Sequence, residues 1–151
     1  MRTGIRLACD VGKVRIGVAR SDPMGVLAVP LDSVPAGSDS GVRIREIALE
    51  YEAIEIIVGL PITMSGEYGP AAEFTQAWVT DLVAVTDIPV RLHDERLTTV
   101  QAQRGLHEAG RTTKSSRSVI DSASAVVLLQ TCLDGERTSG KPMGTEVRRE
   151  S

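Results

Sequence analysis

The first third of the chain carries three apolar segments separated by turns. Apolar residues fill every second position of residues 5–9 and again of residues 16–18, on either side of a turn that contains Gly12. This alternation is typical of strands that bury one face, and a third apolar run follows at residues 26–29. The pattern predicts a three-stranded antiparallel meander.

The middle of the chain alternates between helical and strand patterns. Residues 42–51 repeat their apolar side chains at helical spacing, and residues 54–59 form a near-continuous apolar run suited to a strand buried on both faces. A second helix is expected to begin at Pro70, and residues 89–93 supply another strand. Alternating helices and strands of this kind indicate parallel βαβ units.

Two further helices are expected in the last third of the chain. Thr98 with Gln101 fits a capping box for the first of them. Ser118 is expected to cap the second, which extends to about Leu133. From Asp134 onward the sequence becomes polar, and we expect it to fray.

A single domain is expected, because 151 residues that are 42% apolar bury one core but are too few for two ordinary domains. The domain spans residues 1–134 and is followed by a flexible polar tail at residues 135–151. A meander followed by βαβ units predicts an α/β fold with a mixed five-stranded sheet flanked by helices. RNase H-like nucleases and actin/Hsp70-type ATPases share this arrangement, and the pattern does not separate the two classes.

The composition narrows the cellular setting. No secretory signal and no apolar stretch of bilayer length is present, so we expect a cytoplasmic protein with no membrane partner. Cys9 and Cys132 fit no zinc or redox spacing and lie in apolar runs, where reduced thiols are expected. The formal net charge of −3 argues against a uniformly basic surface but permits a locally basic groove.

Three carboxylates stand at the ends of predicted elements. Asp10 ends the first strand, Glu95 follows the last predicted strand, and Asp121 lies near the start of the last helix. Because α/β sheets place their sites at the carboxyl ends of their strands, these acids are expected to converge there. Carboxylate oxygens are the ligands that Mg²⁺ and Mn²⁺ prefer, so a metal site is a candidate.

Each acid also has a structural interpretation. Asp10 fits a turn, Glu95 fits a surface ion pair with Arg96, and Asp121 fits a capping box at the helix start. Asp94 is as available as Glu95, and on an alternating strand only one of the two points toward the first strand. The spacing does not choose between them.

The helical position of Asp121 favours a functional role. Ala125, Leu128 and Cys132 follow it on one stripe that should face the sheet. The residues at 122–125 are small and allow a close approach. A carboxylate buried there must be compensated, and a metal ion shared with other acids is a natural partner.

Basic residues and a glycine-containing loop accompany these acids. A solvated surface is the ordinary explanation of such charges, but their grouping also suits a nucleic-acid backbone. The loop at residues 59–70 leads into a helix start, whose N–H groups suit a phosphate. His93 is expected to be structural. The basic candidates are Lys13, Arg15, Arg20, Arg104, His107, Arg111, Lys114 and Arg117.

Four segments together resemble the YqgF/RuvX family. They are residues 10–19 (DVGKVRIGVA), residues 58–61 (VGLP) with the glycines and Met64 that follow, residues 94–99 (DERLTT), and residues 121–134. The segments occur in the family's order over nearly the whole chain. This family comprises RNase H-like proteins described as Holliday junction resolvases and as nucleases that mature the 5′ end of pre-16S ribosomal RNA.

The resemblance implies a metal-dependent endonuclease that acts on precursor ribosomal RNA or on branched DNA. It gives the catalytic and metal-binding roles to Asp10, Glu95 and Asp121, and therefore favours Glu95 over Asp94. Two Mg²⁺ or Mn²⁺ ions roughly 4 Å apart are expected, with Asp10 bridging both. Contacts to the nucleic acid are expected from Lys13, Arg15, Arg96, Arg111, Lys114 and Arg117.

Two other functions are compatible with the sequence. Residues 10–12 also resemble a phosphate-binding turn of an actin/Hsp70-type nucleotide binder, although such proteins enclose nucleotide between two domains and this chain has room for one. A ribosome-assembly factor that binds RNA without hydrolysis is the other. The sequence shows no dimer face, so it does not choose between a monomer and a homodimer.

Overall fold

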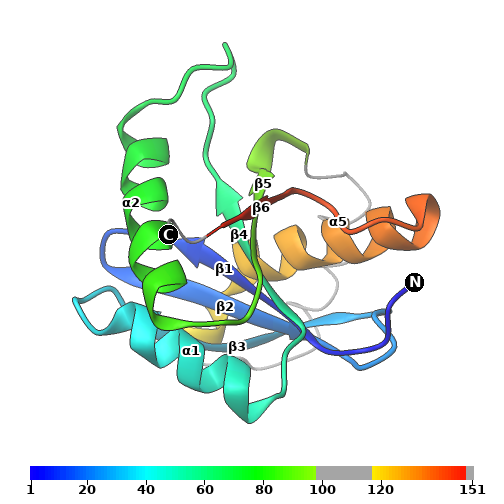
Figure 1. Ribbon diagram of the computed structural model, residues 1–151. Coiled ribbons are helices and arrows are strands. Elements are labelled where there is room, and N and C mark those ends of the chain that lie inside the picture. Colours follow the sequence, from blue (N-terminus) through cyan, green and yellow to red (C-terminus); the bar gives the residue numbers. More distant parts are fainter. Residues whose placement is uncertain (98–116, 149–151) are drawn as a thin grey trace.

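A mixed six-stranded sheet forms the centre of the fold, with α-helices on both of its faces (Figure 1). The computed structural model describes residues 1–97 and 117–148. In chain order the elements are β1 (Arg6–Val11), β2 (Arg15–Ser21), β3 (Ala28–Pro35), α1 (Ser40–Glu50), β4 (Glu55–Leu60), α2 (Pro70–Val85), β5 (Val90–Asp94), the 3₁₀ helix η1 (Glu95–Leu97), α4 (Arg117–Ile120), α5 (Ala123–Ser139) and β6 (Thr145–Val147).

The first three strands form the predicted meander. The sheet order is β3-β2-β1-β4-β5-β6, and β1 pairs antiparallel with β2, as β2 does with β3. β4 joins β1 in parallel, and β5 joins β4 in parallel. The carboxyl ends of β1, β4 and β5 therefore share one border of the sheet, which we call the carboxyl edge.

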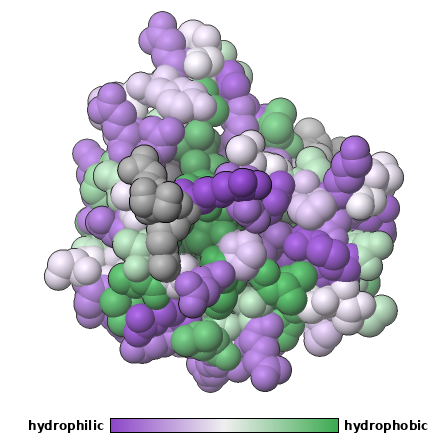
Figure 2. Space-filling view, viewed as in Figure 1, coloured by the Kyte–Doolittle hydropathy of each residue, from purple (hydrophilic) through white to green (hydrophobic). Residues whose placement is uncertain are grey.

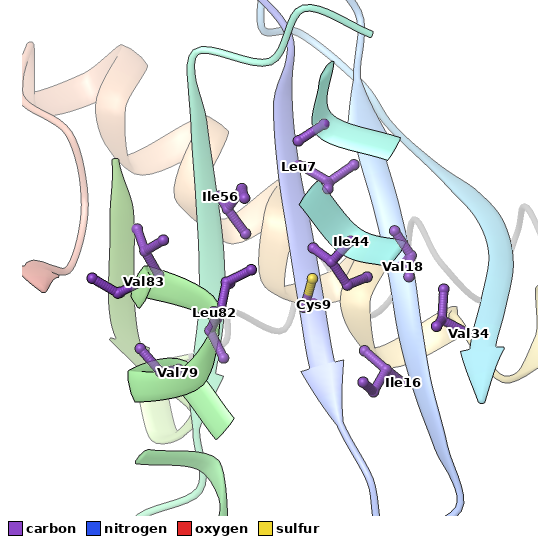
Figure 3. Packing of buried hydrophobic residues seen from close by; sticks show 13 residues of the cluster. Leu7, Cys9, Ile16, Val18, Val34, Ile44, Ile56, Val79, Leu82 and Val83 are labelled. Atoms are coloured by element: carbon purple, nitrogen blue, oxygen red, sulfur yellow. The ribbon is translucent and has the colours of Figure 1, made fainter. Parts of the chain in front are cut away.

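Alternate residues of the strands fill two separate cores. Leu7 and Cys9 of β1 pack with α1 and α2, where Ile44 is fully buried (Figure 3). Ala8, which lies between them in sequence, packs against α5 on the other face. Burying each large aliphatic side chain contributes about 1.5–3 kcal/mol, and a slip of one residue would reverse the two faces. This burial fixes the face on which Asp10 emerges.

The start of α5 is fastened to the sheet by Ser122. Its Oγ accepts a hydrogen bond from Val18 N at 2.9 Å and donates one to Leu31 O at 2.7 Å. The hydroxyl therefore binds two strands instead of capping the helix. As a result, the single helix predicted from Ser118 to Leu133 is divided at this point into α4 and α5.

The polar end of the chain differs from the predicted flexible tail. α5 continues to Ser139, and β6 pairs antiparallel with β5, so the sheet has six strands where five were predicted. The Arg91 side chain donates hydrogen bonds to Met143 O at 2.8 Å and Gly144 O at 2.7 Å. Polar contacts of this kind hold residues 135–148 in the fold, which explains why hydrophobic periodicity did not find them.

Three further predictions concern a helix after Thr98, membrane spans and the two cysteines. The helix predicted to begin at Thr98 lies outside the described residues. None of the helices that the structure describes is long and apolar enough to cross a membrane. Cys9 and Cys132 are free and buried, as predicted, and burial raises the pKa of both thiols.

Candidate active site

Four neighbouring strands each place one residue in the same row at the carboxyl edge. Asp10 pairs with Gly17 of β2, and Gly59 of β4 pairs with His93 of β5. Because β1 and β4 are parallel and in register up to the preceding residues, Asp10 and Gly59 are neighbours as well. The alternation that sends Ala8 toward α5 puts this row on the same face. We call these four residues the central row; its two glycines flank Asp10.

Glu95 lies over Gly59 and meets Asp10. β5 ends at Asp94, and the 3₁₀ helix η1 begins directly with Glu95. A Cβ atom on Gly59 would lie only 2.7 Å from Glu95 Oε1, so a glycine is needed to make room for this carboxyl group. The carboxyl groups of Glu95 and Asp10 share a hydrogen bond. The structure thus brings together two acids that are 85 positions apart along the chain, as their numbers show.

The contact between these two acids perturbs their ionisation. Burial, the charge of Asp10 and the shared hydrogen bond raise the pKa of Glu95 to about 7. Near neutral pH, a proton shared by the two carboxyl groups relieves the repulsion between them. A divalent cation would relieve it too, and carboxylate oxygens are ligands that Mg²⁺ and Mn²⁺ prefer. The chemistry of this pair therefore fits a divalent cation.

Asp94 has a different environment from Glu95. Its carboxylate accepts hydrogen bonds from Arg96 Nη2 at 2.6 Å and from Arg96 Nε at 3.0 Å. These hydrogen bonds lower the pKa of Asp94. Arg96 is thus paired with Asp94, whereas the structural interpretation of the sequence paired it with Glu95. Strand alternation could not predict which of the two acids faces Asp10, because β5 ends at Asp94 and Glu95 already belongs to η1.

Asp121 lies at the β2 side of the central row. A Cβ atom on Gly17 would lie 2.6 Å from Asp121 O and 3.1 Å from Ser122 Cα, so this glycine lets the chain between α4 and α5 touch the sheet. The Asp121 side chain is exposed, and its Oδ2 lies 3.7 Å from Arg15 Nε. The predicted burial of Asp121 on the stripe of α5 is therefore wrong, because the helix break at Ser122 separates it from that stripe, which begins at the buried Ala125.

Of the three predicted metal ligands, two are in contact. Within residues 1–97 and 117–148, no group of three or more His, Cys, Asp or Glu side chains is close enough to hold a metal ion. Asp10 and Glu95 form a carboxylate pair, and the Asp121 carboxylate is turned to Arg15. The arrangement offers two oxygen ligands directly and a third carboxylate beside the same row.

His93 completes the central row without joining the acids in such a group. Only 2% of its surface is exposed, and neither ring nitrogen has a hydrogen-bond partner. Burial lowers the pKa of His93, so the imidazole is held neutral. This fits the structural role expected from the sequence.

The predicted basic residues are not all near the acids. Lys13 and Arg15 are exposed at the turn between β1 and β2, beside the carboxyl edge. Arg20 pairs in register with Leu7, away from that edge, and its guanidinium lies 5.1 Å from the centre of the Tyr51 ring, so its expected position near the acids is wrong. The structure describes no side chain for the remaining basic candidates, which are Arg104, His107, Arg111, Lys114 and Arg117.

The loop between β4 and α2, residues 61–69, rises beyond the carboxyl edge (Figure 1). Thr63 N donates a hydrogen bond to Glu67 O, and Gly66 N donates one to Thr63 O. Glu67 N donates to Thr63 Oγ1 at 3.0 Å. These three N–H groups are used within the loop. They are not the N–H groups at the start of α2 for which a phosphate was predicted, and that role stays a prediction.

Replacing Gly59 by Ala tests whether the contact between Glu95 and Asp10 matters for activity. The new Cβ displaces the Glu95 carboxyl group, which is the far end of a flexible side chain, so the fold should survive. We expect the nucleic-acid cleavage that the sequence resemblance implies to fall about a hundred-fold, since misplacing a reacting group by 1 Å has effects of this order. Steady-state cleavage assays measure the loss.

The matched control is Gly41→Ala on α1. A Cβ atom at Gly41 meets nothing closer than 3.6 Å, so this variant should cleave like the wild type. Both variants should melt within a few degrees of the wild type in thermal unfolding. Equal cleavage by Gly59→Ala and Gly41→Ala would contradict the importance of the Glu95 position.

The sequence matches one known protein family and several relatives. The sequence model of RuvX, described as Holliday junction resolvase, matches residues 4–135. A protein of Streptomyces coelicolor named "Putative pre-16S rRNA nuclease" is 48% identical over 150 residues, which cover 97% of this chain and 90% of that protein. A relative of the same name from Rhodococcus erythropolis is 51% identical over 146 residues, covering 92% of this chain and 82% of the relative.

A solved structure supports the fold. RuvC of T. thermophilus in complex with Holliday junction substrate superposes with a TM-score of 0.66, covering 95% of this chain and 99% of that chain. The sequence identity is 11%, so the likeness concerns the fold alone. It confirms the RNase H-like fold predicted from the sequence.

Proposed function

Because this chain belongs to the RuvX family, we propose that it is a divalent-metal-dependent endonuclease that hydrolyses phosphodiester bonds in structured nucleic acid. The observation that supports this most is the contact between the Asp10 and Glu95 carboxyl groups at the carboxyl edge. Two acids held this close need a cation or a proton between them. A nuclease needs that cation to face a phosphate.

The chain's own residues prepare this site in distinct ways. Asp10 is held by the burial of β1 on both faces, and Glu95 is held by the space over Gly59. These two carboxylates would hold the divalent ions, which, when bound, activate a water molecule and stabilise the leaving oxygen. Asp121 would complete the ligand set from the β2 side. Its release from Arg15 would also free that guanidinium to meet a phosphate.

Cations at the carboxyl edge would orient the nucleic acid. Lys13 and Arg15 are exposed at the β1–β2 turn, where a phosphate backbone can reach them. Arg96 is committed to Asp94, so we expect it to position the segment next to Glu95 as well as to contact substrate. Arg111, Lys114 and Arg117 remain proposed contacts in the part of the chain for which no side chain is described.

The names of the relatives favour precursor ribosomal RNA as the substrate, and the family description favours a four-way DNA junction. In either case the protein would act in the cytoplasm. RNA trimming needs only a monomer, whereas paired symmetric cuts in a junction favour a two-fold homodimer. The substrate and the oligomeric state are therefore linked proposals.

Offering the purified protein both substrates side by side tests this function. Precursor ribosomal RNA and a four-way DNA junction are incubated with Mg²⁺, Mn²⁺ or EDTA, and the cut positions are mapped. We expect cleavage with metal and none with EDTA. Failure to cut either substrate with either metal would contradict the proposal and favour an RNA-binding assembly factor without hydrolytic activity. Tight ATP binding in calorimetry would instead favour the nucleotide-binding alternative.

A further inference from the structure

Exposed apolar side chains lie in the segments that border the carboxyl edge. They lie in four segments that border this edge: one in the β1–β2 turn, two in the loop of residues 61–69, one at the end of η1, and one in α4 just before Asp121. Exposures of 54–90% show that none of them belongs to a core. We call this set the apolar rim, and its members are Val14, Met64, Tyr68, Leu97 and Ile120.

The rim is built into the site by the loop of residues 61–69, which projects at the top of the molecule in the space-filling view (Figure 2). Internal hydrogen bonds at Thr63 brace this loop, and Arg96 Nη1 donates to Thr63 O at 3.4 Å. A Cβ atom built on Gly66 would lie 3.6 Å from Arg96 Nη1. The loop that carries Tyr68 therefore lies against the arginine that follows Glu95 in the sequence.

An apolar rim around a carboxylate pair indicates a partner with both phosphates and flat apolar faces. Nucleotides have both, because each base has a π-face that stacks on aromatic and apolar side chains. In a duplex those faces are stacked on neighbouring bases, and the outer surface shows mainly phosphate and sugar. A continuous duplex offers the apolar rim no base face to contact. A strand whose bases are unstacked does offer such faces.

We propose that the apolar rim binds unpaired nucleotides next to the scissile phosphate, with the Tyr68 ring stacking on a base. This rests on the proposed nuclease function and names its substrate class: a strand that is single-stranded or opened at the cut. Lys13 and Arg15 contact the phosphates of the same strand. In both candidate substrates the cut would then fall at an unpaired or opened position.

A binding experiment without metal separates this inference from cleavage. The probe is a 12-nucleotide RNA with 2-aminopurine at its centre, used alone and annealed to its complement, in EDTA at low ionic strength. Anisotropy gives the affinity, and 2-aminopurine quenching reports stacking. We expect the wild type to bind the unpaired probe at least ten-fold more tightly than the duplex. Tyr68→Ala should lose most of the quenching and about ten-fold in affinity.

Two variants serve as controls. Tyr68→Phe keeps the ring and should keep both the quenching and the affinity. Met24→Ala removes a side chain that is 66% exposed in the turn before β3, at the opposite end of the sheet, and should bind like the wild type. Circular dichroism should show the same fold for all variants.

The outcomes distinguish the two proposals. Equal affinity of the wild type for unpaired and annealed probe, or unchanged binding by Tyr68→Ala, overturns the role of the apolar rim even if the protein cleaves nucleic acid. Binding that depends on Tyr68 in a protein that cuts no substrate with Mg²⁺ or Mn²⁺ supports the rim and overturns the nuclease function.

Discussion

Replacing Asp10 by Asn is expected to reduce metal-dependent cleavage on the order of a thousand-fold or more, because Asp10 is central to the proposed ligand set. The substitution keeps the size of the side chain and removes its charge. It should leave substrate binding in EDTA intact or slightly stronger, since one charge that repels phosphates is lost. Single-turnover cleavage and anisotropy together separate the chemical step from binding.

Stability shows whether this loss is local. Repulsion between Asp10 and Glu95 disfavours the folded state above the raised Glu95 pKa, so without metal Asp10→Asn should melt at the same temperature as the wild type or higher. The control Asp81→Asn changes an exposed carboxylate on α2 and should cleave normally. Wild-type cleavage by Asp10→Asn would contradict the assignment. If that variant also bound precursor RNA and supported its maturation, an assembly factor without hydrolysis would be favoured.

The largest expected effect on stability is at Glu136, a polar residue that the sequence analysis assigned to the flexible tail. It is 3% exposed and accepts hydrogen bonds from Arg2, while Arg6 Nη2 lies 2.8 Å from its Oε2. Arg6 is itself fully buried. Burial opposes ionisation of Glu136, but Arg2 and Arg6 outweigh this effect and lower its pKa to about 2. The end of α5 is thereby tied to the N-terminus.

Replacing Glu136 by Gln should lower the free energy of unfolding by about 3–5 kcal/mol at pH 7, because it leaves the buried Arg6 without its counter-charge. The melting temperature should fall by roughly 10 °C. A carboxylate with a lowered pKa stabilises the fold above about pH 4.5, and this contribution is lost as the pH falls toward 2. The difference between wild type and variant should therefore shrink over that interval in denaturant titrations.

The control for this prediction is Glu146→Gln. Glu146 pairs with Arg148 at 3.8 Å on the surface, where such pairs contribute at most about 1 kcal/mol. A Glu136→Gln variant as stable as Glu146→Gln, or a stability difference from the wild type that does not change between pH 7 and pH 3, would show that the buried ion pairs do not hold the end of α5.

Periodicity predicted the parts of the fold that apolar burial decides. The meander, the parallel β4 and β5, and the placement of Asp10 at the carboxyl edge follow from which residues alternate and which run continuously. The same reasoning brought Glu95 to that edge. It could not bring the two carboxyl groups into contact, because the contact depends on space at Gly59. An isolated glycine inside a strand pattern was the available signal.

The hydrophobic pattern of the sequence could not predict features that depend on particular polar contacts. Ser122 divides a helix that periodicity predicted as continuous, since its hydroxyl binds two strands. Hydrogen bonds from Arg91 and ion pairs at Glu136 hold β6 and the last turns of α5. These segments therefore need no apolar pattern, and periodicity could not predict them. The choice between Asp94 and Glu95 came from the family resemblance, and its physical reason is the Arg96 partnership with Asp94.

Anomalous diffraction from crystals soaked in Mn²⁺ shows directly whether the Asp10–Glu95 pair binds a divalent cation. We expect an anomalous peak between the carboxyl groups of Asp10 and Glu95, about 2 Å from an oxygen of each, and its loss in crystals of Asp10→Asn. Absence of a peak at this pair, in crystals of a protein that cleaves nucleic acid with Mn²⁺, would contradict the claim that the carboxylate pair is the metal centre.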